Sequence, residues 1–201
     1  ARNVVFGVVL KIYQMIIPFL MRTAMIYFMG MEYLGLNSLF VSILEVLNLA
    51  ELGVGSAMVY SMYKPIAEDD SVTICALLKL YRIYYRIIGC VVACTGIIFL
   101  PFIPKFIKGS VPGELNIYVL YLLNLGSTVL SYWLFAYKNS LLVAHQRVDL
   151  NSKVILVTNT IQYALQLIVM IFTKNYYLYL IVALVTQAIT NIVSAVVASV
   201  K

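Results

Sequence analysis

The chain has 201 residues, of which 63% are hydrophobic and 11% are charged, and its formal net charge is +6. A soluble domain is typically about 45–50% apolar and about 25% charged, so this composition excludes a soluble enzyme, a disordered chain and a disulfide scaffold. Because a spanning helix needs roughly 20 apolar residues, the chain has room for about six spans, and we expect an all-α integral membrane bundle.

Apolar runs separated by polar or helix-breaking residues predict the spans in chain order. The six predicted spans cover residues 3–29, 36–62, 80–104, 115–137, 154–173 and 176–200. The first is too long for the apolar region of a cleaved signal peptide, so we expect it to stay in the protein. The fourth and fifth are separated by a stretch, 138–153, that we interpret as a polar loop.

The basic residues predict the orientation of these spans, since cytoplasmic loops are enriched in Lys and Arg. Ten of the fourteen fall on one side of the membrane, namely Arg2, Lys11, Lys64, Lys79, Arg82, Arg86, Lys138, Arg147, Lys153 and Lys201. The other side has Arg22, Lys105, Lys108 and Lys174. This bias predicts that both ends are cytoplasmic in a multi-pass protein of the cell membrane. No loop carries a basic cluster of the size that nucleic acid requires.

A basic and aromatic segment lies at the start of the third predicted span. Lys79, Arg82 and Arg86 share one helical face, and tyrosines lie among them. This mixture is typical of a segment at the depth of the lipid headgroups. Two interpretations are open. The segment contacts membrane lipid or a lipid-linked phosphate, or it is simply the interfacial end of the third predicted span.

Five of the six predicted spans carry a polar stripe when residues are placed at about 100° each. The stripes are Lys11, Gln14, Pro18 and Arg22; Asn37, Asn48, Glu51 and Gly55; Asn116, Asn124, Ser127 and Ser131; Ser152, Asn159, Gln162, Gln166 and Thr173; and Gln187, Thr190, Asn191 and Ser194. They predict either a polar cavity or hydrogen bonds between helices, which contribute about 0.6 kcal/mol each.

Arg22 is the most costly of these residues, because an arginine at mid-bilayer costs about 2.5–3.5 kcal/mol on insertion scales. Three settings would lower that cost: an ion pair with Glu45 or Glu51, the pyrophosphate of a lipid-linked sugar, or snorkelling of the side chain. The candidate substrate-binding residues are Lys11, Arg22, Asn48, Glu51, Gln162 and Gln166.

The sequence lacks the motifs of common chemistry. It has no Walker loop, GxSxG, HExxH or dinucleotide fingerprint, and three cysteines with one histidine give no zinc spacing. Glu45 and Glu51 point about 120° apart on a helix, so they do not form an acid/base pair. We therefore expect no catalytic residue, cofactor or metal, and a protein that is not an enzyme.

Two stretches resemble a known family. The first contains GMEYLGLNSLF at 30–40, LAELGVGSA at 49–57 and YSMYKPIAE at 60–68. It resembles the N-terminal part of bacterial polysaccharide-biosynthesis membrane proteins, the oligosaccharide flippases of the multidrug/oligosaccharidyl-lipid/polysaccharide exporter superfamily. The second, KNSLLVAHQR at 138–147, is similar to a cytoplasmic loop of that family, with His145 where the family has an acidic residue.

The resemblance implies a two-lobed alternating-access transporter with six helices in its first lobe. The chain starts at Ala1 and ends directly after an apolar segment, so we expect a fragment: this first lobe, whose partner is the missing C-terminal lobe. Such transporters move undecaprenyl-pyrophosphate-linked oligosaccharide across the cytoplasmic membrane for surface polysaccharide biosynthesis.

Three alternatives are open. A multidrug antiporter of the same superfamily handles cations, but the first span has Lys11 and Arg22 and no carboxylate, which suits an anionic substrate better. A membrane-embedded polysaccharide polymerase or glycosyltransferase needs catalytic carboxylates or a metal motif, and no DxD is present. A purely structural subunit leaves Arg22 without a role.

Overall fold

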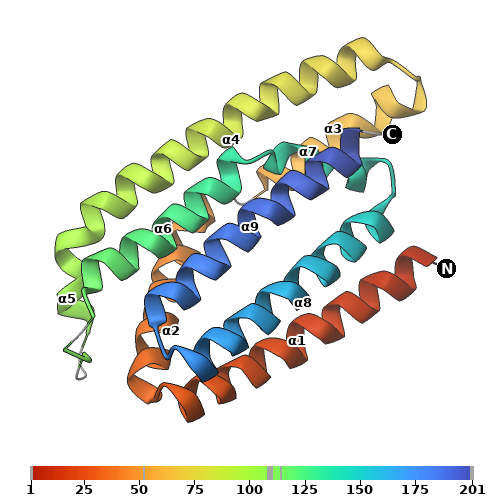
Figure 1. The fold of residues 1–201 in the computed structure, drawn as a ribbon. Coiled ribbons are helices and arrows are strands. Elements are labelled where there is room, and N and C mark those ends of the chain that lie inside the picture. Colours follow the sequence, from red (N-terminus) through yellow and green to blue (C-terminus); the bar gives the residue numbers. More distant parts are fainter. Residues whose placement is uncertain (1, 52, 108–110, 114, 200–201) are drawn as a thin grey trace.

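The computed structural model describes residues 2–51, 53–107, 111–113 and 115–199, and every regular element in these residues is helical (Figure 1). The α-helices are α1 (Arg2–Phe28), α2 (Met31–Asn48), α3 (Val54–Ala67), α4 (Ser71–Phe99), α5 (Ile103–Phe106), α6 (Ile117–Trp133), α7 (Ala136–Ala144), α8 (Val148–Phe172) and α9 (Tyr176–Ser199). Two 3₁₀ turns, η1 (Leu49–Glu51) and η2 (Leu100–Phe102), connect some of them.

Several helices are long and apolar enough to cross a membrane. Four such segments occur in the described residues: Gly7–Phe28, Ser71–Phe106, Val148–Phe172 and Tyr176–Ala198. A fifth is obtained if α6 and α7, which are bent by 50°, form one crossing. Large apolar side chains such as Phe172, which is 80% exposed, cover the outside of the bundle. The chain is therefore an all-helical protein with the features of a multi-pass membrane protein.

The second predicted span, 36–62, is not a continuous helix. α2 ends at Asn48, η1 follows, and Gly53 has a φ of 87°, a left-handed conformation that glycine adopts without strain. α3 begins only after this interruption, at Val54. The prediction of six spans is thus not confirmed.

The predicted polar loop 138–153 is wrong, because α7 and the first turns of α8 occupy most of it. α7 forms because Tyr137, Leu142 and Ala144 are buried, and the helix packs against α3 and α9. An ion pair joins the short α7–α8 turn to the first turn of α8, where Arg147 Nε lies 3.3 Å from Oδ1 of the buried Asp149.

The third predicted span, 80–104, is longer than expected. α4 begins at Ser71 because Asp70 caps it, accepting a hydrogen bond from the Thr73 backbone N–H at 3.0 Å. The Thr73 hydroxyl also donates to this carboxylate and, together with the backbone bond, holds the pKa of Asp70 below its usual value. The first turns of α4 are therefore helical before the predicted span begins.

The helices α1, α8, α9, α6 and α4 lie side by side in that order (Figure 1). α2 contacts α1, α4 and α6, and α3 and α7 contact each other and α4. α1 begins and α9 ends at one end of the bundle, where the turns α3–α4 and α7–α8 also lie. The turns α1–α2 and α8–α9 lie at the opposite end.

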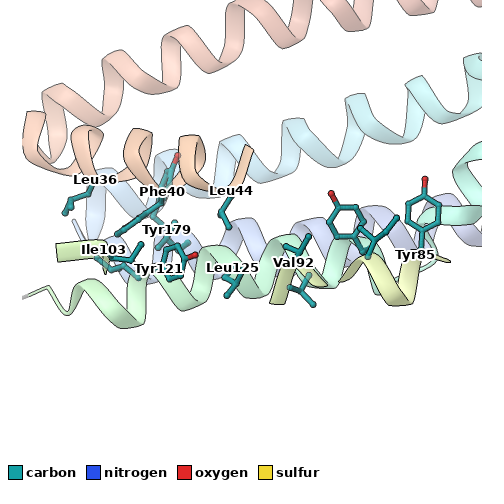
Figure 2. Close-up of a cluster of buried hydrophobic side chains, with 14 of the residues drawn as sticks. Leu36, Phe40, Leu44, Tyr85, Val92, Ile103, Tyr121, Leu125 and Tyr179 are labelled. Atoms are coloured by element: carbon teal, nitrogen blue, oxygen red, sulfur yellow. The ribbon is translucent and has the colours of Figure 1, made fainter. Parts of the chain in front are cut away.

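Figure 2 shows the core between α2, α4, α6 and α9. Phe40 of α2 and Tyr121 of α6 are fully buried and meet edge to face, with ring centroids 6.0 Å apart. α4 approaches α6 closely at Gly96, where an added Cβ would lie 2.5 Å from a δ-carbon of Leu125. Small residues at such positions allow membrane helices to pack tightly.

Candidate functional site

A cavity of about 390 Å³ lies where α1, α2, α6, α8 and α9 meet. Methionine, leucine and tyrosine side chains form part of its wall. Its polar lining residues come from four different helices and are Arg22, Asn37, Asn124, Gln162 and Gln166. Every one of them belongs to a polar stripe that the sequence predicts, so the stripes of α1, α2, α6 and α8 converge here.

α1 supplies the cation of the cavity. Pro18 and Arg22 are one turn apart and both line it, while Met21 and Met25 on the same helix are buried. Arg22 itself is exposed, and among the described residues its guanidinium has no hydrogen bond or ion pair. The cavity therefore presents an unpaired positive charge.

The proposed ion pair between Arg22 and Glu45 or Glu51 is not formed in the structure. Glu51 Oε1 accepts a hydrogen bond of 3.0 Å from the Tyr85 hydroxyl. Asn48 accepts one of 2.9 Å from Tyr132, whose ring stacks on that of Tyr85 at 6.3 Å. Asn48 and Glu51 therefore belong to a separate polar cluster with α4 and α6, and neither lines the cavity.

Lys11 is also placed away from the cavity. It shares a face of α1 with Arg22 but lies eleven residues earlier, which is about 16 Å along the axis at a rise of about 1.5 Å per residue. Its side chain is exposed and is not part of the cavity wall.

Gln166 of α8 supplies a second unsatisfied group. It is only 2% exposed, and its Nε2 donates to the backbone oxygen of Tyr179 at 3.3 Å. Its Oε1 is buried and has no hydrogen-bond partner among the described residues. A buried acceptor without a partner is unfavourable by about 1–3 kcal/mol, so the wall of the cavity contains one unsatisfied polar group at Gln166.

Aromatic residues of α9 support this site, and no sequence signal identified them. Tyr176 is buried and donates to Asn37 Oδ1 at 3.1 Å. Its ring stacks on Tyr179, with centroids 5.8 Å apart, and Tyr33 of α2 meets it edge to face at 5.6 Å. These contacts fix Asn37 and the wall that Tyr179 contributes.

The predicted interfacial residues lie elsewhere. Lys79 and Arg82 line a groove of about 520 Å³ between α4 and α7, together with Lys138 of α7. Arg86 is exposed but is not part of the groove's lining, and its backbone oxygen accepts a hydrogen bond of 3.4 Å from the Trp133 indole.

The polar lining residues of the cavity suit the binding of an anionic, hydroxylated group. Its cation can hold an anionic group, and its amide side chains can exchange hydrogen bonds with hydroxyls. No carboxylate, histidine or cysteine is among its lining residues. Within the described residues, no three metal-ligating side chains of His, Cys, Asp or Glu gather. No protein-family model, curated protein or solved structure matches the chain.

Proposed function

We propose that this chain is part of a flippase that carries undecaprenyl-pyrophosphate-linked oligosaccharide across the bacterial cytoplasmic membrane for surface polysaccharide biosynthesis. The observation that supports this proposal most is the unpaired Arg22 in a polar cavity between apolar helices. The resemblance of 30–68 to oligosaccharide flippases points to the same function.

The charge of the cavity fits a pyrophosphate. An arginine within a membrane costs about 2.5–3.5 kcal/mol on insertion scales, and the cost falls when an anion pairs with it. The planar guanidinium binds two oxygens of a phosphate group at once, which a lysine ammonium cannot reproduce. Arg22 would therefore hold the charged end of the lipid-linked sugar.

The size and polarity of the cavity fit one part of that substrate. At about 390 Å³, the cavity is near the lower end of ligand pockets, which span about 300–1,000 Å³. It has room for a pyrophosphate and an adjoining sugar, whose hydroxyls would meet Asn37, Asn124 and Gln162. A second lobe, which the family resemblance implies, would enclose the rest of the oligosaccharide. Its movement relative to this lobe would open the cavity to each side of the membrane in turn.

The proposed topology has six crossings with both ends in the cytoplasm. α2 with α3 would be a broken second crossing, and α6 with α7 a bent fourth one. Two features support this arrangement: α1 begins and α9 ends at the same end of the bundle (Figure 1), and ten of the fourteen basic residues fall on that predicted side. In a background without the native cysteines Cys75, Cys90 and Cys94, a cysteine introduced near Asp149 should be shielded from an impermeant thiol reagent in intact cells, and one near Asn175 should react. The reverse pattern would contradict the topology.

The alternatives receive less support from the site. A drug antiporter for cations would use a carboxylate, and a polymerase or glycosyltransferase would use acid and base groups. The cavity is lined by neither. Its charge is positive and its other polar groups are neutral amides and tyrosine hydroxyls, which favours an anionic, hydroxyl-rich substrate.

Export measurements on Arg22 variants test the proposal. The intact gene, with Arg22→Gln, Arg22→Lys or the control Lys105→Gln, is returned to cells whose own copy is deleted. Surface glycan is measured by lectin binding, and protein abundance by immunoblot. Arg22→Gln should abolish export at normal abundance. Arg22→Lys should retain part of the export, because the positive charge stays but the planar group that binds two phosphate oxygens is lost. Lys105 is exposed on α5, outside the cavity, so its variant should export normally.

Two results would overturn the proposal. Normal export by Arg22→Gln at normal abundance would show that the substrate does not need this cation. A loss of protein that matches the loss of export would instead make Arg22 a structural residue.

A further inference from the structure

The groove between α4 and α7, called here the α4–α7 groove, has both cationic and apolar lining residues. Its cations are Lys79 and Arg82 of α4 and Lys138 of α7. Val72, Cys75 and Tyr137 are among its less polar lining residues. No carboxylate is among the lining residues of this groove of about 520 Å³, so its charge is entirely positive.

The α4 cations are available to a ligand. Lys79 and Arg82 are exposed, and neither has a hydrogen bond or ion pair among the described residues. Lys138 is half-buried and comes from a different helix, with its Nζ 5.4 Å from the centre of the Phe135 ring. The three cations therefore approach one groove from two helices.

An exposed apolar stripe continues from the groove along α4. Ile83 is 56% exposed, Ile87 53% and Val91 49%, and their spacing of four residues places them on one helical face. A cationic pocket followed by an apolar stripe matches a molecule with an anionic head and hydrocarbon chains. The groove shares no lining residue with the Arg22 cavity, so the two are separate sites.

We propose that the α4–α7 groove binds an anionic phospholipid of the surrounding membrane. Its phosphate lies against Lys79, Arg82 and Lys138, and its acyl chains lie along Ile83, Ile87 and Val91. Basic pockets between membrane helices recognise anionic headgroups in this way. The bound lipid bridges α4 and α7, which also contact each other directly.

Cys75 gives a direct readout, because it is a free, exposed thiol in the groove. In the intact protein with Cys90→Ser and Cys94→Ser, the rate of Cys75 alkylation by an uncharged maleimide is measured in neutral detergent micelles. Phosphatidylglycerol is then titrated in, with phosphatidylcholine as the neutral comparison. Phosphatidylglycerol should slow alkylation saturably, and phosphatidylcholine should not.

Removing the cations should weaken this protection. Each Lys or Arg near an anionic lipid is worth roughly a fivefold change in affinity, so Lys79→Gln, Arg82→Gln and Lys138→Gln together should raise the half-protecting lipid fraction roughly a hundredfold. Arg82→Gln alone should raise it roughly fivefold and serves if the triple variant does not fold. Lys64→Gln, Lys105→Gln and Lys174→Gln, which remove the same charge elsewhere, should leave protection unchanged.

Four results would overturn the proposal. The first is equal protection of Cys75 by both phospholipids, and the second is undiminished protection in the triple and Arg82→Gln variants. The third is protection by inorganic phosphate at the same concentration, and the fourth is stronger protection by a polyprenyl pyrophosphate. The third would assign the groove to a free phosphate and the fourth to the transported lipid.

Discussion

Replacing Gln166 by leucine distinguishes a ligand-binding cavity from a hydrogen-bonded contact between helices. The side chain makes one hydrogen bond, from Nε2 to the Tyr179 backbone oxygen at 3.3 Å, and leaves Oε1 buried without a partner among the described residues. Leucine has a similar volume and no polar atom. The substitution therefore removes one weak hydrogen bond, which is favourable, and one buried unsatisfied acceptor, which is unfavourable.

The two contributions have different sizes. A hydrogen bond between membrane helices contributes about 0.6 kcal/mol on average, whereas an unsatisfied buried acceptor costs about 1–3 kcal/mol. Gln166→Leu should therefore raise the free energy of unfolding by about 0.5–2.5 kcal/mol. Because Gln166 lines the cavity, the variant should also export less glycan.

A matched variant at another buried amide gives the contrast. Asn191 donates to the Ser131 backbone oxygen at 3.3 Å, and its Oδ1 accepts from Gln187, so its oxygen is satisfied. Asn191→Leu should lower the free energy of unfolding by about 0.6–1.7 kcal/mol. Both variants are compared by unfolding in mixed micelles and by export. A stability loss in Gln166→Leu as large as that in Asn191→Leu would refute the cavity interpretation of Gln166.

Two further predictions concern the helices that hold the site. Gly96→Ala should lower the unfolding free energy relative to Gly126→Ala by about 1–3 kcal/mol. The new Cβ would lie 2.5 Å from Leu125 at Gly96, whereas nothing lies within 4 Å of a Cβ at Gly126. Equal effects of the two substitutions on unfolding in mixed micelles would contradict the α4–α6 packing. Asp70→Ala should lower the free energy of unfolding near pH 7. The pKa of Asp70 is lowered on folding. The stabilisation by its carboxylate is therefore present above the unfolded pKa of about 3.9 and is lost as the pH falls further. If the difference in unfolding free energy between Asp70→Ala and the parent protein stayed constant from pH 7 to pH 3 in the same assay, the result would contradict the proposed role of Asp70 as a helix cap.

The class of fold was predictable because composition alone excludes a soluble protein. Helix breaks were harder to predict. The interruption before Gly53 depends on a backbone conformation that an apolar, glycine-containing run does not reveal. α7 was missed because its polar residues resemble a loop, whereas Tyr137 and Leu142 become buried only once α3 and α9 pack against it.

The helix faces that line the cavity were predictable, but the position of the cavity along the helix axes was not. Helical spacing placed Lys11 with Arg22 and Asn48 with Asn37, and each pair does share a face. The members of a pair are eleven residues apart, however, or about 16 Å along the axis, so only Arg22 and Asn37 reach the cavity. Depth is set by how the helices are staggered, which depends on contacts such as that of Tyr176 with Asn37.

Direct binding of substrate tests the central claim, that the Arg22 cavity holds the pyrophosphate of a lipid-linked sugar. The intact protein in neutral nanodiscs is titrated with undecaprenyl-pyrophosphate-linked sugar and with the same lipid lacking phosphates. We expect saturable binding of the pyrophosphate lipid only, weakened at least about tenfold by Arg22→Gln, because a hydrogen bond to a charged group contributes about 1.5–3 kcal/mol. Equal affinity of the parent protein and Arg22→Gln for the pyrophosphate lipid would contradict the central claim.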